Sequence, residues 1–166
     1  MALSSKRTVT KKGLGRQSIQ LKIEDRDLQG LLRSFSKMDD IAKNDMRKIA
    51  GDISQKVAER VRQNAGIYGN TNQNRAIAES IRLSKSEKAP YFTIGGTQRV
   101  TSTGARAGEI LAGAEFGSTR FKQFPNHRGQ QGWFIFPTLR AMQKQITQEW
   151  LDGYKLVRDA WIGRIG

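Results

Sequence analysis

The sequence predicts an α+β fold in which a small, mainly antiparallel β-sheet packs against two long amphipathic helices. Two long segments repeat apolar residues every three or four positions, whereas several short segments alternate apolar and polar residues. Of the 166 residues, 37% are hydrophobic and 17 are glycine, which is enough to build a globular core. At about 150 residues per domain, this length favours one domain rather than two.

The first 17 residues are expected to form a flexible basic arm ahead of a single domain that spans residues 18–166. They contain few large apolar side chains, so burial cannot offset the entropy lost on ordering them. Directly after the arm, Ile19, Leu21 and Ile23 alternate with polar residues. This alternation predicts a half-buried strand.

Two helical segments are expected to follow this strand. The first segment, residues 25–38, has an acidic start and one apolar face made of Leu28, Leu31, Leu32, Phe35 and Met38. Asp39 and Asp40 then mark a break or a new N-cap. Beyond them, a second apolar face predicts the longest helix of the chain over about residues 41–64.

The middle of the chain is expected to contain exposed loops and one β-hairpin. Residues 81–84 and 91–94 carry the alternating pattern of the two hairpin strands. The apolar run 105–116 fits a helix or a strand equally well. Turn-forming residues dominate three segments, which are expected to be mobile loops: 66–74, 95–104 and 117–132.

The C-terminal part predicts a strand followed by a long helix. Residues 133–136 are all large and apolar, which favours a strand, and Pro137 suits the first position of a helix. From Leu139 to Trp161, apolar residues recur every three or four positions, which predicts an amphipathic helix about 36 Å long. Gly153 is expected to weaken this helix by about 1 kcal/mol relative to alanine.

The basic excess is concentrated in the arm. The chain carries 29 Lys and Arg against 15 Asp and Glu, a net charge of +14. Residues 1–23 hold six basic and no acidic residues, whereas residues 24–65 hold nine basic and eight acidic ones. The arm could neutralise phosphates without sequence preference, or it could be a solvated tail or order against a partner protein. The residues expected to contact DNA or a partner are Lys6, Arg7, Lys11, Lys12 and Arg16.

The residue types argue against an enzyme and against a cofactor or metal site. The absence of cysteine excludes disulfides and zinc fingers and fits a reduced cytoplasm. His127 is the single histidine and lies in a Gly/Gln-rich loop, which disfavours a catalytic triad. The glycine-rich residues 95–104 lack the Gly-Lys-Ser/Thr ending of a phosphate loop. The paired acids at 24–25 and 39–40 are better explained as helix starts than as metal ligands.

No membrane association is expected. The N-terminal residues are basic but lack the apolar stretch of a Sec-type signal. No segment approaches the roughly 18 consecutive apolar residues of a membrane span. The sequence therefore predicts a soluble protein.

The tryptophans are expected to pack rather than to stack on nucleic-acid bases. Trp133 lies in the expected strand, and Trp150 and Trp161 lie on the apolar face of the C-terminal helix. This spacing favours the core or a subunit interface. The candidate interface residues are Trp150, Tyr154 and Trp161.

Two short motifs give the sequence a resemblance to a known family. An Ala-rich run ends in Glu115-Phe116-Gly117-Ser118, and after a variable loop Phe134, Phe136 and Pro137 lead into the C-terminal helix. Over about residues 25–162 this pattern resembles the tail-component family of tailed double-stranded DNA bacteriophages, which comprises tail completion, neck and minor tail proteins. The basic arm is not part of the matching pattern.

The resemblance implies a structural virion protein at the head-to-tail junction, made in the host cytoplasm. Such subunits commonly form a sixfold ring between the portal–adaptor complex and the tail tube or tail terminator, with DNA passing through the centre. Glu115, Phe116 and Gly117 would form a structural corner, in which Phe116 is anchored in the core and Gly117 adopts a conformation that other residues resist. The alternative hypothesis is a stand-alone, nonspecific nucleic-acid-binding protein; a small nuclease using carboxylates with His127 is a remote third.

Overall fold

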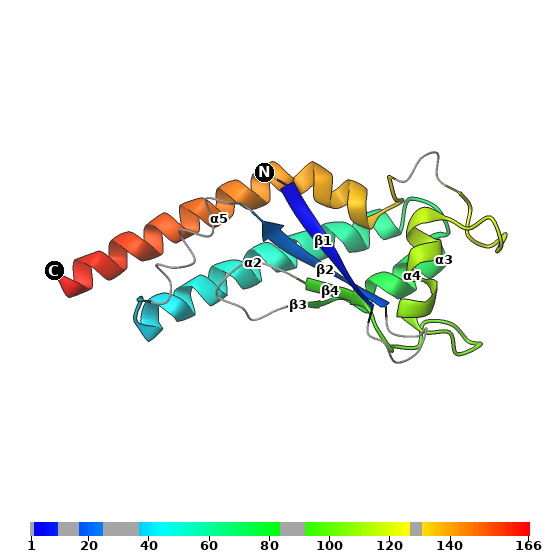
Figure 1. Ribbon diagram of the computed structural model, residues 1–166, viewed down its shortest axis with the longest axis horizontal. Helices are drawn as coiled ribbons and strands as arrows, with labels where there is room; N and C mark the ends of the chain where they lie inside the picture. The colour runs from blue at the N-terminus through cyan, green and yellow to red at the C-terminus, as the bar shows by residue number, and fades with distance from the viewer. Residues whose placement is uncertain (1, 10–16, 25–36, 84–91, 127–130) are drawn as a thin grey trace.

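The computed structural model describes residues 2–9, 17–24, 37–83, 92–126 and 131–166, and it has the α+β architecture that the sequence predicts (Figure 1). The helix expected over residues 25–38 falls almost entirely outside the described residues. In chain order the elements are β1 (Ala2–Val9), β2 (Gln17–Glu24), α2 (Asp40–Ala65), α3 (Thr71–Ala78), β3 (Arg82–Leu83), β4 (Phe92–Gly95), α4 (Ala107–Phe116) and α5 (Ile135–Ile165).

The sheet is antiparallel throughout and has the strand order β1-β2-β4-β3. β2 is the strand predicted after the arm, and β3 and β4 are the predicted hairpin. β1 differs from the prediction, because residues 2–9 of the expected flexible arm form a strand that pairs with β2 from Ala2 opposite Glu24 to Val9 opposite Gln17. Pairing with β2 supplies partners for the backbone groups of these residues, which their composition alone does not reveal.

The two long helices run antiparallel along the molecule, with α3 and α4 gathered at one end (Figure 1). Contacts between them keep a regular register: Asn64 meets Thr138, Lys56 meets Glu149, and Asp39 meets Arg164. α5, with 31 residues, is longer than α2, with 26. α2 was expected to be the longest helix, so that expectation is wrong for the described residues.

Gly153 allows the two long helices to approach closely. A Cβ atom at this position would lie 2.7 Å from Cγ2 of Ile49 on α2, which is closer than side-chain atoms can pack. The glycine that weakens α5 as an isolated helix is therefore explained by packing against α2.

The structure corrects two local predictions and decides between the two alternatives left open for a third segment. The expected loop 66–74 contains the first half of α3, which starts after its N-cap Asn70. The expected strand 133–136 is wrong, because α5 already begins at Ile135. The ambiguous segment 105–116 contains a helix, α4.

The core lies between α2, α5, the short helices and the inner face of β4. Its largest fully buried side chains include Trp150, Phe92, Phe134 and Met46. The sheet contacts α2, α3 and α4, whereas α5 packs chiefly on α2. The sheet is therefore covered by one long helix and two short ones rather than by both long helices.

Candidate functional site

The junction between α4 and α5 is organised by the buried carboxylate of Glu115. Glu115 lies in the last turn of α4 and is 0% exposed. It accepts hydrogen bonds from the backbone N–H groups of Phe134 (3.1 Å), Ile135 (3.0 Å) and Phe136 (2.8 Å). These groups belong to the first turn of α5, where N–H groups have no partner within the helix. Glu115 is therefore the N-terminal cap of α5, supplied from another helix.

One carboxylate and one proline account for the whole N-terminus of α5. The residue at the N-cap position, Phe134, offers no capping side chain. The next N–H groups all reach Glu115, and Pro137 has no N–H that needs a partner. The negative charge also lies at the positive end of the helix dipole, where it is favoured.

Burial and capping act on Glu115 in opposite directions. Burial raises the pKa of the Glu115 carboxyl above its ordinary value, and the N–H groups of Ile135, Phe136 and Phe134 limit that rise. The backbone also holds this residue, because the Trp133 N–H donates to the Glu115 carbonyl at 2.8 Å. Gly132 completes the enclosure: its φ is +83°, and a Cβ atom there would overlap Oε1 of Glu115.

The rest of the Glu-Phe-Gly-Ser motif forms the exit from α4. Gly117 has a φ of +81°, and a Cβ atom there would lie 2.5 Å from the backbone of Asn126, so the predicted role of this glycine is confirmed. Phe116 is 36% exposed and packs on the ring of Phe136 at a centroid distance of 5.3 Å. The prediction that Phe116 anchors in the core is wrong. The hydroxyl oxygen of Ser118 accepts from the N–H groups at positions 120 and 121.

The other predicted site residues do not meet at this junction. Trp150 is 0% exposed and Tyr154 is buried, so neither faces a neighbouring subunit; Trp161, on the same face of α5, is half-buried. Their apolar spacing marks the face of α5 that packs on α2. Lys6 and Arg7 lie on β1, whereas Lys11, Lys12, Arg16 and His127 lie outside the described residues.

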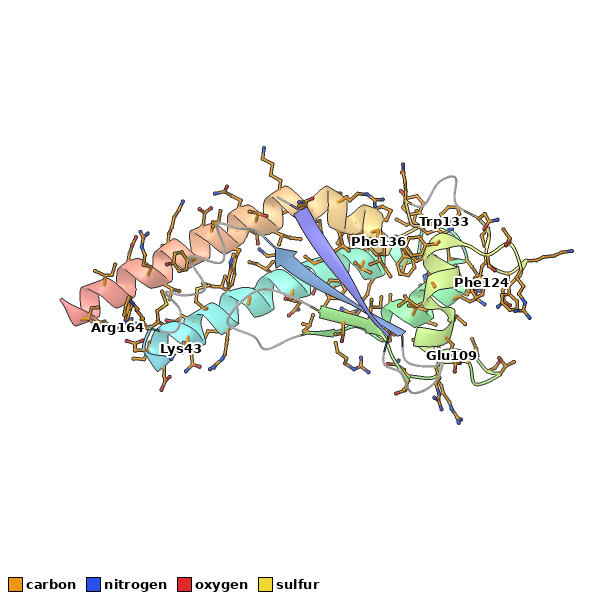
Figure 2. All side chains as sticks on the ribbon, in the orientation of Figure 1. Lys43, Glu109, Phe124, Trp133, Phe136 and Arg164 are labelled. Carbon is orange, nitrogen blue, oxygen red and sulfur yellow. The ribbon has the colours of Figure 1, made fainter. Side chains whose placement is uncertain are left out.

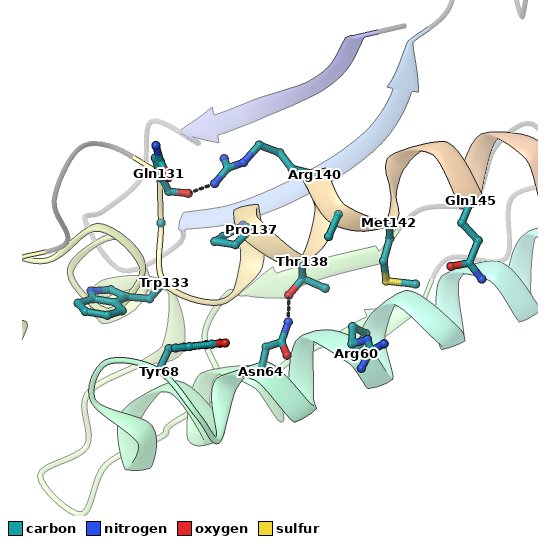
Figure 3. Close-up of a pocket in the computed structure, with 12 residues that line it drawn as sticks. Arg60, Asn64, Tyr68, Gln131, Trp133, Pro137, Thr138, Arg140, Met142 and Gln145 are labelled. Carbon is teal, nitrogen blue, oxygen red and sulfur yellow. Dashed lines mark hydrogen bonds between the residues drawn. The ribbon is translucent and has the colours of Figure 1, made fainter.

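A groove of about 550 Å³ opens beside the junction, between α2 and the start of α5 (Figure 3). We call it the Arg60–Arg140 groove. Its described lining contains two arginines and no carboxylate. The residues that line it are Arg60, Asn64, Tyr68, Gln131, Gly132, Trp133, Pro137, Thr138, Arg140, Ala141, Met142 and Gln145.

This groove is not predicted by the sequence. Its two arginines are distant in sequence, and they line one groove because α2 and α5 run antiparallel. Asn64 fixes this pairing by donating to the hydroxyl of Thr138 at 2.5 Å. The available signal was the absence of acidic residues from both the 60–68 and the 131–145 segments, but it carries weight only once these segments are known to be neighbours.

A second, more apolar groove of about 520 Å³ lies on the α4 side of the junction. Ile110, Phe116, Phe121 and Phe124 supply its apolar lining. Phe121 is 51% exposed, and the Arg120 guanidinium lies 5.2 Å from the centre of its ring. Figure 2 shows Phe124, Trp133 and Phe136 together at this end of the molecule, far from Arg164 and Lys43. Aromatic residues are thus concentrated where α4 meets α5.

Comparisons with known protein families, with curated proteins and with solved structures find no match to this chain. Within the residues that the structure describes, no group of three or more His, Asp or Glu side chains could hold a metal ion. No helix in that part of the chain has the length and apolar character needed to cross a membrane.

Proposed function

We propose that this chain is a structural subunit of the head-to-tail connection of a tailed double-stranded DNA bacteriophage, of the tail completion or neck type. In this role it assembles into a ring, expected to hold six subunits, around the path of the DNA. One face of the ring contacts the portal–adaptor complex, and the other contacts the tail tube or tail terminator. The finished protein resides at the head–tail junction of the virion.

The observation that carries this proposal is the contact between the two halves of the sequence motif. Glu115, in the first half, caps the helix that begins among the aromatic residues of the second half. Each half is short and of limited specificity alone. Because they form one buried contact, their joint occurrence is a property of the fold, and this strengthens the resemblance on which the proposal rests.

The surface beside this contact is suited to neighbouring subunits. Phe121 and Phe116 are 51% and 36% exposed at the apolar groove. Exposed aromatic side chains that gather around a groove are typical of interaction surfaces. A ring subunit needs such surfaces for its neighbours within the ring and for the rings above and below.

Deletion of the gene, with complementation from a plasmid, tests the proposal. We expect filled heads and tails that remain unjoined without the protein, and infectious particles when it is supplied. Cryo-electron microscopy of the complemented particles is expected to place a ring of this chain at the junction. Normal joined particles in the deletion strain, or virions that lack the protein by mass spectrometry, would overturn the proposal.

A pair of matched variants tests the role of the apolar groove. Phe121→Ser is expected to lower the yield of joined particles, because it removes an exposed aromatic ring at the groove. Leu83→Ser is the control, since Leu83 is also exposed, at 40%, but lies on β3 away from the groove. Equal yields from the two variants would assign the contacts to another surface.

A further inference from the structure

We propose that the Arg60–Arg140 groove binds a nucleoside phosphate, either as a free nucleotide or as one unit of a single-stranded nucleic acid. In this arrangement the phosphate accepts hydrogen bonds from an arginine side chain of the lining and the base lies against Tyr68 and Trp133. The inference rests on the lining of the groove and is independent of the ring proposal. It also involves different residues from the basic arm that the sequence singled out.

The charge of the groove is positive and uncompensated by its described surroundings. Arg60 donates to the side-chain oxygen of Gln63 (3.4 Å), and Arg140 donates to the carbonyl of Gln131 (2.5 Å). Both acceptors are neutral, and among the described residues neither arginine lies within 4.0 Å of a carboxylate. A guanidinium group that is not paired with a carboxylate can donate two hydrogen bonds to the oxygens of a phosphate.

The nearest acidic side chain on α5 does not cancel this charge. Glu149 lies one turn beyond Gln145, which lines the groove, and it accepts from Gln145 at 2.8 Å. Its charge is already matched by Lys56 on α2, whose ammonium group lies 2.9 Å from the carboxylate. The excess positive charge at the groove therefore comes from the two arginines.

The N-terminus of α5 borders the groove but is not the anion site. The N–H groups that lack a partner within the helix donate to Glu115, as described above, and Pro137 has no N–H group. Phosphates commonly bind to unoccupied N–H groups at helix starts. Here recognition of the anion falls to the arginine side chains, so binding is expected to depend on those residues directly.

Tyr68 and Trp133 form an aromatic wall at one end of the groove (Figure 3). Tyr68 is 49% exposed and points its hydroxyl into the groove, with Trp133 beside it (Figure 3). Trp133 is held in place because its indole N–H donates to the Pro125 carbonyl at 3.0 Å and because Gly69 lies against its ring. A fixed aromatic surface next to guanidinium groups suits a planar base attached to a phosphate.

The size and remaining polar groups fit the same ligand class. A volume of about 550 Å³ lies within the range of sites for small ligands, roughly 300–1,000 Å³. Gln131 and Gln145 bring side-chain amides that can hydrogen-bond the edge of a base. An acidic peptide would use the arginines but would leave the aromatic wall without a matching group, so the lining favours a nucleoside phosphate.

The test measures binding of purified full-length chain to four probes. A fluorescein-labelled short oligothymidylate is followed by anisotropy, and unlabelled dTMP, inorganic pyrophosphate and poly-L-glutamate are used as competitors. Arg60→Gln/Arg140→Gln is compared with Arg47→Gln/Lys48→Gln, which removes the same charge from exposed positions about 18 Å farther along α2. Tyr68→Ala tests the aromatic wall, and circular dichroism melting shows that each variant is folded.

We expect the Arg60/Arg140 variant to lose at least about tenfold in affinity, and the control pair to lose less than about threefold. Tyr68→Ala is expected to weaken dTMP and oligothymidylate but not pyrophosphate. Stronger binding of oligothymidylate than of dTMP identifies a strand as the ligand, and equal binding identifies a free nucleotide. Equal losses in the two double variants, no binding of either nucleotide probe by the wild-type chain, or equal competition by poly-L-glutamate overturns the proposal.

Discussion

The carboxylate of Glu115 and the backbone N–H of Ile135 form a shared hydrogen bond, with the nitrogen 3.1 Å from Oε1 and 3.0 Å from Oε2. This contact joins the end of α4 to the beginning of α5 in the interior of the molecule. It also aligns the carboxylate so that each oxygen reaches a second N–H, Oε2 that of Phe134 and Oε1 that of Phe136. One side chain thus determines where the longest described helix starts.

Removal of this cap is expected to destabilise the protein strongly. Glu115→Ala leaves three N–H groups without their acceptor, and each buried unsatisfied group costs about 1–3 kcal/mol. We therefore expect a loss of at least about 3 kcal/mol in the free energy of unfolding, measured by urea denaturation. Glu115→Gln should recover only part of it, because its amide NH₂ group points a donor toward other donors. Glu59→Gln, at an exposed position of α2, is the control and should change stability by less than about 0.5 kcal/mol.

Gly132→Ala is expected to destabilise the junction through two effects, backbone strain and overlap of the added Cβ atom with Glu115. Comparison with Gly96→Ala separates these two effects. Gly132 and Gly96 both have a positive φ, +83° and +81°, so alanine strains the backbone at either position. At Gly96 nothing lies within 4 Å of the added Cβ atom, whereas at Gly132 that atom would overlap Glu115.

Thermal unfolding of the two alanine variants distinguishes strain from overlap. Gly96→Ala should lower the free energy of unfolding by about 1 kcal/mol, the strain of placing a residue with a Cβ atom at a positive φ. Gly132→Ala should cost at least about 2 kcal/mol more, because the Glu115 carboxylate must shift away from the N–H groups that it caps. Equal costs would show that the carboxylate can move without losing its contacts.

Elements determined by local patterns could be predicted from the sequence. The periodicity of α2 and α5, the alternation in β2 and the β3–β4 hairpin all depend on residues close in the chain. The same holds for the cap of α2, where Asp39 accepts from the N–H of Ala42 at 2.8 Å. α3 was missed because its first turn, Thr71 to Asn74, consists of polar residues that also favour loops. Its helical state depends on the Asn70 cap and on burial of Ile77 and Ala78.

The start of α5 and the Arg60–Arg140 groove depend on contacts between distant residues. A run of large apolar residues from Trp133 to Phe136 resembles a strand, and Pro137 resembles a first helical residue. The helix instead begins at Ile135, two residues before Pro137, because Glu115 supplies acceptors for the first N–H groups of the helix. Arg60 and Arg140 line the same groove only through the packing of α2 on α5. Periodicity could therefore predict the helices but not the surface that they create together.

The titration of Glu115 gives a site-specific prediction. Burial raises the pKa of this carboxyl above its ordinary value, more than the N–H groups lower it. The folded state then holds the proton more tightly than the unfolded state. The contribution of Glu115 to the free energy of unfolding is therefore greatest below the ordinary carboxyl pKa, and it declines as the pH rises from that value through the raised one.

Carboxyl-detected NMR titration measures this pKa directly. A pH profile of the overall free energy of unfolding is less informative, because hydrogen bonds lower the pKa values of Asp39 and Glu149. The contributions of these two carboxyls to stability therefore change with pH in the opposite direction to that of Glu115. We expect the Glu115 resonance to titrate at a higher pH than the resonances of these two residues. A Glu115 pKa at or below the ordinary value would mean that the capping N–H groups outweigh burial.

Gly153→Ala is expected to reveal the close approach of α5 to α2. In an exposed helix this substitution would stabilise by about 1 kcal/mol, because alanine is the better helix former. Here the added methyl group would lie 2.7 Å from Cγ2 of Ile49, and the overpacking should cost about 1–3 kcal/mol. Gly51→Ala is the control on α2, since nothing lies within 4 Å of its Cβ position, and it should raise stability. We therefore expect urea midpoints to move in opposite directions, and Ile49→Ala combined with Gly153→Ala to cost less than the sum of the single changes. A stabilising Gly153→Ala would show that α2 and α5 can separate at this crossing without loss of packing.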